Sequence, residues 1–175
     1  MIAKDDMFRM PDNGLFHHFF CNSTPRARAI SQIIVVKRSV IDIYNAAYYD
    51  DYLRYGYCPG YGITKEGMEE SIRVFSKYII MCDDIPVGCI SSKLIETGVY
   101  EVANLCIIPE YQGKGIGTQA IRFLKTNLED WKILTLVTPL DKKQNVKFYT
   151  EKCGFRIEST ERDGNVELVR FVAER

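Results

Sequence analysis

The sequence carries no net charge and has no apolar run long enough to cross a bilayer. Its 23 Lys and Arg residues balance 23 Asp and Glu residues in a chain of 175. A neutral chain lacks the overall basic surface with which proteins hold nucleic acid or an anionic membrane. The first residues are charged, and no signal-type apolar stretch follows them. We therefore expect a cytoplasmic protein with neither nucleic acid nor a membrane as its partner.

Metal-binding patterns are also missing. The six cysteines form no C-x-x-C pair, and only His17 and His18 are available to join a zinc site. Cys82, Cys89 and Cys106 lie in apolar, strand-like runs, which is typical of reduced and buried thiols in a cytosolic protein. We expect no metal ion, and we interpret both histidines as structural or surface residues.

The composition indicates one compact α/β domain. Hydrophobic residues make up 46% of the chain and aromatic residues 12%, which supports a sizeable core. Residues 1–32 form an N-terminal arm of uncertain structure, and residues 33–175 carry the regular patterns. These patterns predict strands over residues 33–36, 77–82, 85–94, 100–108, 133–138, 155–160 and 166–173. They predict helices over about residues 39–52, from residue 64, from the glycines near residue 115 and from residue 141, with Thr64 and Asp141 as caps.

The most informative segment is a run of alternating glycines, Gly113, Gly115 and Gly117, between the end of a strand at Pro109 and a long amphipathic helix. A helix N-terminus offers unpaired backbone N–H groups and the positive end of a dipole. Glycine lets a bulky anion approach this backbone because no Cβ stands in the way. The segment therefore predicts a pyrophosphate site that needs no metal.

Two other interpretations of the glycines stay open on chemistry alone. A dinucleotide-binding loop of the G-x-G-x-x-G type would need glycine where Thr118 stands, although Asp141 follows the next strand about where a ribose-binding acid would lie. The glycines could also serve only a tight turn from strand to helix. A Walker loop is excluded because no Gly-Lys-Ser/Thr sequence ends the run.

At this segment the sequence resembles the GNAT superfamily of N-acetyltransferases. Residues 112–117 read QGKGIG and match the family signature Q/R-x-x-G-x-G/A, and PEY precedes them. Further on, residues 145–155 read NVKFYTEKCGF and are similar to the family's second cofactor-side motif. The resemblance covers about residues 33–174. It implies a single α/β (α+β) domain with a mixed, mostly antiparallel central sheet, flanked by helices and containing splayed central strands.

The resemblance implies that acetyl-CoA is the co-substrate and that no metal is needed. Backbone N–H groups of the glycine segment would hold the pyrophosphate, and the preceding strand would pair with the pantetheine arm. One N–H group of that strand could also polarise the thioester carbonyl. The implied cofactor residues are Leu105, Cys106, Ile107, Gln112, Gly113, Lys114, Gly115, Ile116, Gly117, Thr118 and Asn145.

The reaction that the resemblance implies is direct transfer of the acetyl group to an amine. An alkyl ammonium has a pKa of about 10, so it must lose a proton before it attacks. Glu101 is the candidate base, acting through water, and the alternative is an exposed carboxylate without a catalytic role. Tyr149 is the candidate acid toward the departing thiolate, and the alternative is a core tyrosine. Cys106 and Cys153 are poor candidates for a nucleophile because neither has a histidine nearby in the sequence.

Tyrosines and aspartates gather where the family builds the wall of its acceptor site. Seven of the eleven tyrosines fall between Tyr44 and Tyr61, with Asp50 and Asp51 among them. Ring faces and carboxylates suit a cationic amine, so the sequence favours a small-molecule or peptide amine as the acceptor. Tyr44 and Tyr48, which are four residues apart, could instead pack a helix against the sheet.

Two functions other than acetyl transfer also stay open. A non-catalytic acyl-CoA-binding or sensing domain would keep the pyrophosphate site without needing catalytic groups. The presence of both Glu101 and Tyr149 favours the enzyme. A self-associating structural protein, such as a homodimer that exchanges the N-terminal arm, is the third interpretation.

Overall fold

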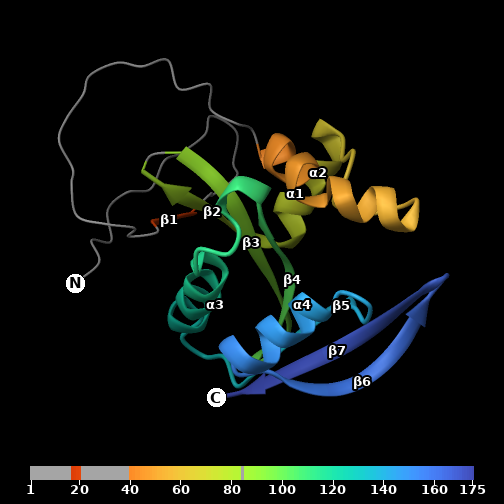
Figure 1. Ribbon diagram of the computed structural model, residues 1–175. Helices are drawn as coiled ribbons and strands as arrows, with labels where there is room; N and C mark the ends of the chain where they lie inside the picture. Colours follow the sequence, from red (N-terminus) through yellow and green to blue (C-terminus); the bar gives the residue numbers. More distant parts are fainter. Residues whose placement is uncertain (1–16, 21–39, 84) are drawn as a thin grey trace.

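The computed structural model describes residues 17–20, 40–83 and 85–175 (Figure 1). The strand predicted over residues 33–36 lies outside the described residues. The strands are β1 (His17–Phe20), β2 (Ser76–Cys82), β3 (Ile85–Glu96), β4 (Val99–Ile107), β5 (Ile133–Pro139), β6 (Arg156–Asp163) and β7 (Val166–Glu174). The helices are α1 (Val40–Tyr55), α2 (Lys65–Val74), α3 (Ile116–Asn127) and α4 (Lys143–Lys147), with a 3-10 turn η1 (Pro109–Tyr111) and a π-helix η2 (Phe148–Lys152).

The strands form one sheet in the order β1-β2-β3-β4-β5-β7-β6. Neighbouring strands run antiparallel except for β1 with β2 and β4 with β5, which run parallel. The prediction of a mixed, mostly antiparallel central sheet flanked by helices is therefore confirmed. β6 lies at one edge of this sheet, and every one of its residues is exposed.

The two central strands, β4 and β5, separate after a short stretch of pairing. Beyond Glu101, β4 continues to Ile107 and β5 continues to Pro139 with no pairing between them. We call this divergence the splay, and it confirms the splayed central strands that the sequence predicted. The three residue pairs that join the strands are Val99 with Ile133, Tyr100 with Leu134 and Glu101 with Thr135.

A bulge in β4 lies just after its last pairing with β5. On the other side of β4, Val102 pairs with Ser92 and Asn104 pairs with Ser91, which leaves Ala103 as an extra residue. A bulge bends its strand and increases the local twist. The bulge thus gives a physical reason for β4 to turn away from β5 at this point.

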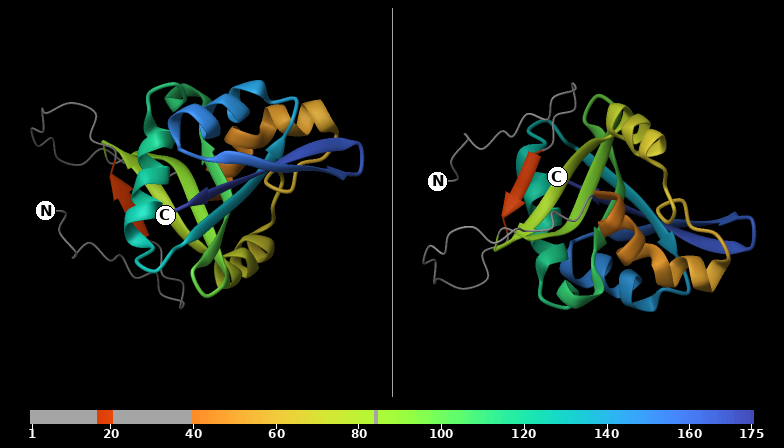
Figure 2. Two further views of the ribbon diagram at one scale, coloured as in Figure 1. Left: turned by 90° about the horizontal axis from the view of Figure 1, so that it is seen from below. Right: turned by 90° about the horizontal axis from the view of Figure 1, so that it is seen from above.

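The helices α1 and α3 lie on opposite faces of the sheet (Figure 1 and Figure 2). On β2, Lys77 bonds to Tyr44 of α1, whereas the next residue, Tyr78, packs against Phe123 of α3. Successive side chains of a strand point to opposite faces. We therefore refer to the α1 face and the α3 face of the sheet.

Helix ends test the two predicted caps. The Thr64 hydroxyl accepts a backbone N–H bond of 3.1 Å from the first turn of α2, so this cap is confirmed. The prediction for Asp141 is wrong, because α4 begins at Lys143 without a side-chain cap. The Asp141 carboxylate instead accepts a 2.6 Å bond from the Tyr55 hydroxyl and lies 3.4 Å from the Arg54 guanidinium. A phenol and a cation from α1 thus occupy the oxygens that a cap would have used.

The core joins the sheet to the helices on both faces. Fully buried side chains come from α1, β2, β3, α3, β5 and β7, among them Ile43, Ile80, Ile90, Leu124 and Phe171. Within the described part of the chain, no helix is long and apolar enough to span a membrane.

Candidate active site

The glycine loop, residues 112–117, leads from the end of β4 into α3. Gly113 and Gly115 have φ angles of 72° and 78°, in the left-handed region that residues with a Cβ rarely adopt. Nothing lies within 4 Å of the point where a Cβ of either glycine would stand. Their role is therefore conformational, and the space beside them is open to a ligand.

The first turn of α3 presents free backbone donors at the end of this loop. Gly115 is the N-cap residue and provides no side-chain cap, and the first intrahelical bond runs from the Gln119 N–H to the Gly115 carbonyl. The N–H groups of Ile116, Gly117 and Thr118 consequently have no intrahelical partner. Free N–H groups at the positive end of a helix dipole form a site for an anion.

The third glycine of the loop serves close packing. A Cβ on Gly117 would lie 3.0 Å from the Phe148 ring of η2, tighter than an ordinary contact. The glycine therefore lets α3 approach the π-helix that carries Tyr149. The sequence indicated three equivalent glycines, and the structure gives them two different tasks.

Side chains of the loop fix its position against β4. The Gln112 amide donates a 2.8 Å bond to the Ile107 carbonyl, and the Lys114 ammonium lies 4.7 Å from the centre of the Tyr111 ring. The Gln112 bond ties the loop to the last residue of the strand. Lys114 adds a positive charge to the loop that leads to these amides.

One edge of β4 is left without a partner strand in the splay. The Ile108 N–H donates to the Val87 carbonyl on β3 at 2.9 Å. Because alternate residues direct their backbone groups to alternate edges of a strand, Cys106 also faces β3, whereas Leu105 and Ile107 face the diverging edge. An extended ligand in the splay would pair with Leu105 and with the Ile107 N–H, because the Ile107 carbonyl already accepts the Gln112 amide. The backbone of Cys106, which was also predicted to contact the cofactor, is engaged within the sheet.

Asn145 lies where α4 meets the end of β5. Its amide donates a 3.1 Å bond to the hydroxyl of Thr138, whose side chain is buried. The bond holds the start of α4 on the β5 side of the splay. Asn145 thus lies on the opposite side of the splay from the predicted cofactor strand β4, and its partner is a protein side chain.

Tyr149 combines a packed ring with an available hydroxyl. Its ring lies against Phe148, Phe155 and Phe171, with centroid distances of 4.9, 5.9 and 5.5 Å. Its hydroxyl makes no hydrogen bond to any described residue, and no described buried side-chain oxygen or nitrogen lacks a partner. The hydroxyl must therefore reach the surface of the chain. Burial of the side chain raises its pKa, so the phenol stays protonated at neutral pH.

Tyr48 of α1 lies on the α1 face of the sheet. Its ring packs edge-on against that of Tyr44, with 5.6 Å between the ring centres. Burial raises its pKa well above the usual range, with smaller contributions from Cys106 and Tyr149.

Glu101 stands at the apex of the splay, as the last residue of β4 that pairs with β5. It pairs with Lys93 of β3, and the Lys93 ammonium lies over the Phe75 ring, as does that of Lys77 on the α1 face. Glu101 therefore lies on the α1 face as well. Its side chain forms no ion pair or hydrogen bond with another described residue, Tyr149 included.

The buried thiols are poor nucleophiles. Burial raises the pKa of Cys89 and of Cys153 to about 11, and it raises the pKa of Cys106 well above its usual range. A thiol that stays protonated is not the reactive species. Among the described residues, no group of three or more His, Cys, Asp or Glu side chains is arranged to hold a metal ion.

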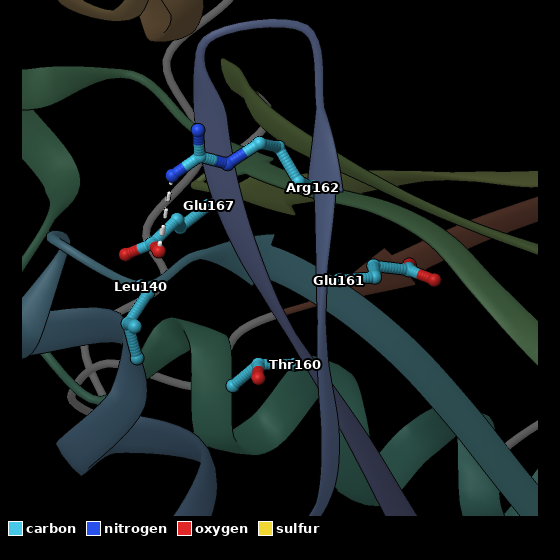
Figure 3. A pocket seen from close by; sticks show the side chains of 5 residues that line it. All are labelled: Leu140, Thr160, Glu161, Arg162 and Glu167. Carbon is cyan, nitrogen blue, oxygen red and sulfur yellow. Dashed lines mark hydrogen bonds and ion pairs between the residues drawn. The ribbon is translucent and has the colours of Figure 1, made fainter.

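Two shallow hollows lie at the β6–β7 hairpin, away from the predicted site residues. The hollow in Figure 3 is crossed by an ion pair of 3.3 Å between Arg162 and Glu167. The second hollow lies between the hairpin and the C-terminal end of α1, where Tyr55 and Asp141 line it. Neither contains Glu101, Tyr149 or the glycine loop. Both are surface features, which the sequence did not indicate.

Sequence reasoning missed a buried polar cluster behind β4. Lys77 is 3% exposed, and it bonds to Tyr44, which bonds to Asn104 on the strand of the splay. The one available signal was a lysine at the start of an apolar strand run, KYIIMC. Its partner is 33 residues away in the chain, so no local pattern pointed to it.

Comparison with known proteins agrees with this geometry. The model of the acetyltransferase (GNAT) family matches residues 38–155. An uncharacterised protein of Bacillus subtilis strain 168, YrkN, is 39% identical over 51 residues, which span 29% of this chain and 28% of YrkN. The match thus covers well under two thirds of that relative.

Solved structures share the fold. A crystal structure of an acetyltransferase from Thermus thermophilus has a TM-score of 0.61 and 20% identity, over 77% of this chain and 88% of that one. A GNAT family acetyltransferase from Elizabethkingia anophelis, crystallised with acetyl-CoA bound, has a TM-score of 0.54 and 19% identity, over 64% of this chain and 84% of that one.

Proposed function

The chain belongs to the acetyltransferase (GNAT) family, and we propose that it transfers an acetyl group from acetyl-CoA directly to a primary amine of a small molecule or peptide. One observation carries the proposal. β4 has a free edge at Leu105 and at the Ile107 N–H, and the same strand ends in a loop that opens onto free helix amides. An extended arm that ends in a pyrophosphate fits this arrangement.

The residues of the chain would hold the donor in two places. The amides of Ile116, Gly117 and Thr118 would bind the pyrophosphate, with the Lys114 ammonium beside them. Leu105 and the Ile107 N–H would pair with the pantetheine arm as a strand does. Acetyl-CoA supplies a thioester, whose carbonyl carbon is the electrophile.

Proton transfer would involve one group from each side of the splay. Glu101 would take a proton from the ammonium of the acceptor, through water, so that the neutral nitrogen can attack. The Leu105 or Ile107 N–H would stabilise the negative charge that develops on the carbonyl oxygen. Tyr149 would give its proton to the sulfur as the carbon–sulfur bond breaks, and its free hydroxyl supports this role. The proton that the new amide nitrogen loses would then restore the phenol. The buried thiols with raised pKa values argue for direct transfer rather than a covalent enzyme intermediate.

The acceptor would bind against the surface formed by α1 and the loop that follows it. The rings of Tyr52 and Tyr61 stack at 4.6 Å, and Tyr49 lies 5.6 Å from Tyr61. Tyr49 and Tyr52 are exposed, and Asp50 on the same helix is exposed too. Ring faces with a free carboxylate suit an alkyl ammonium. Tyr44 and Tyr48 pack toward the sheet, so they are less suited to this wall.

Release of free thiol from acetyl-CoA across a panel of primary amines tests the proposed function. We expect turnover on at least one amine, with a mass increase of one acetyl group on the acceptor. The variants Tyr52→Ala and Tyr49→Ala should weaken acceptor affinity and leave CoA affinity unchanged. Binding of CoA without turnover on any amine would contradict the enzyme and favour the sensing domain.

A further inference from the structure

A lysine is buried behind the strand that the donor would pair with. The Lys77 side chain on β2 is 3% exposed, and its ammonium donates a 2.9 Å bond to the Tyr44 hydroxyl. It also lies over the rings of Tyr44 and Phe75, at 5.3 and 5.5 Å from their centres. No described carboxylate pairs with it. An ammonium buried without a counter-ion is costly, so its presence calls for a reason.

The hydrogen bonds continue from Lys77 to β4. The Tyr44 hydroxyl donates to the Asn104 side-chain oxygen at 2.8 Å, and the Ser91 hydroxyl donates to the same oxygen. The Asn104 amide nitrogen donates to the Cys106 sulfur at 3.7 Å. Four elements, β2, α1, β3 and β4, thereby converge on one side chain of the splayed strand. Every buried side-chain nitrogen and oxygen of this cluster has a hydrogen-bond partner. The hydrogen bonds therefore fix one arrangement of these buried side chains.

The anchored residue occupies a distinctive place in β4. Asn104 is the first residue after the bulge at Ala103, and it directly precedes Leu105. Its backbone neighbour Leu105 faces the diverging edge, where no strand holds it in place. The Asn104 side chain is hydrogen-bonded to Tyr44, Ser91 and Cys106. These bonds compensate for the backbone pairing that β4 loses in the splay.

From this placement we infer that Lys77, Tyr44 and Asn104 are positioning residues, which fix the bulged segment of β4 so that the Leu105 N–H points at the thioester oxygen. The inference rests on the proposed function, because that function supplies the thioester. A small displacement of the Leu105 N–H would lower the reaction rate, because this group stabilises the charge that develops on the carbonyl oxygen. The same displacement would leave binding of the remote pyrophosphate unchanged. The cluster should therefore affect turnover rather than donor binding. Burial lowers the pKa of Lys77, in keeping with an ammonium held away from water.

Two variants separate a positioning role from a structural one. Tyr44→Phe removes the hydroxyl and leaves the buried Lys77 ammonium without its hydrogen bond, so both the melting temperature and kcat should fall. The double variant Lys77→Met with Tyr44→Phe replaces both partners with apolar groups of similar size, which should restore much of the melting temperature. It should not restore kcat, because Asn104 still lacks the hydrogen bond from Tyr44 that ties β4 to α1. We expect kcat to stay about tenfold or more below wild type, with the KM for acetyl-CoA and the Kd for CoA within about twofold.

The matched control is Tyr100→Phe on the same strand. This change also removes one phenol hydrogen bond, of 2.6 Å to Asp130, at the paired start of β4. It should leave kcat unchanged. Recovery of kcat together with the melting temperature in the double variant would overturn the inference, as would a loss of CoA affinity equal to the loss of kcat.

A readout without turnover keeps the inference separate from the proposed function. In protein labelled with ¹⁵N-leucine, the Leu105 amide signal should move in the double variant, and it should be unchanged in Tyr100→Phe. A Leu105 signal that keeps its wild-type position in the double variant would overturn the inference. Absence of turnover on every amine in the wild-type protein would contradict the proposed function alone, and the amide signal would still decide whether the cluster fixes β4.

Discussion

At the scale of single residues, the candidate catalytic groups differ in how the fold holds them. Tyr149 has three aromatic neighbours and a free hydroxyl, so its orientation is fixed while its proton remains available. Glu101 is held only through the backbone of β4, at the apex of the splay. The first arrangement favours a proton donor of constant geometry, and the second leaves room for a water molecule beside the carboxylate.

Replacement of Tyr149 by phenylalanine tests the proton donor. We expect kcat to fall about 10²-fold, because the thiolate must then leave without a proton. Burial raises the pKa of Tyr149, so in the wild-type protein the phenol stays protonated as the pH rises through 9, and kcat should show no alkaline decline in that range. The measurement is kcat against pH for both proteins. A kcat for Tyr149→Phe equal to that of the wild type would contradict the role as proton donor. An alkaline decline below pH 9 in the wild type that disappears in Tyr149→Phe would contradict the raised pKa.

Replacement of Glu101 by glutamine tests the base. At neutral pH kcat/KM should fall about 10²-fold to 10³-fold, and the loss should shrink toward pH 10, because the acceptor amine then loses its proton to solvent. CoA affinity should not change. Glu158→Gln, on the exposed edge strand β6, is the control and should behave as wild type. A loss that is independent of pH would speak against Glu101 as the base.

At the scale of elements, a pair of variants separates the role of the glycine loop in CoA binding from its effect on stability. Gly115→Ala forces a Cβ into a left-handed conformation, which costs about 1–2 kcal/mol, and it should weaken CoA binding at least tenfold. Gly164→Ala is a matched control, because Gly164 has a φ of 55° and open space around it, in the turn between β6 and β7. Both variants should lose similar unfolding free energy, and only the first should lose CoA affinity in calorimetry. Equal CoA affinity in the two would contradict the proposed role of the loop.

The helix α1 is also tied to the far side of the splay. Asp51 forms an ion pair with Lys142, and their side chains are 14% and 24% exposed. Because the pair is partly buried, its contribution to stability should lie between those of exposed and of fully buried ion pairs. Asp51→Asn should therefore cost about 1–2 kcal/mol of unfolding free energy. Glu69→Gln breaks the exposed pair with Lys65 and should cost under about 0.5 kcal/mol. Thermal unfolding measures both, and equal losses would contradict the comparison.

The elements that the sequence predicted correctly are those set by local chemistry. Thr64 caps α2 through its own first turn, and the glycine loop needs only the conformations of Gly113 and Gly115. Elements set by distant partners were missed. Asp141 was predicted to cap a helix and instead binds Tyr55, which is 86 residues away in the chain. The arm strand β1 exists through its pairing with β2, a contact that no local pattern in residues 1–32 indicates.

At the scale of the whole molecule, α1 bridges the two parts of a split sheet. Tyr44 near its start reaches Asn104 on β4, and Asp51 toward its end reaches Lys142 at the start of α4. These contacts link the two sides of the splay on the α1 face, while the glycine loop leads from the end of β4 into α3 on the other face. The family match spans residues 38–155 and so includes α1, the splay and η2, but not the β6–β7 hairpin. The prediction of the donor site therefore rests on elements that the family shares.

The central claim is that free amides at the start of α3 grip the pyrophosphate of a CoA molecule whose pantetheine arm lies along β4. Calorimetric titration with CoA and, separately, with pantetheine tests it most directly. CoA should bind with a Kd between about 1 μM and 1 mM. Pantetheine, which lacks the pyrophosphate, should bind roughly 100-fold more weakly, since charge-assisted bonds to the amides are lost. No heat of binding with CoA, or equal affinities for the two compounds, would contradict the claim.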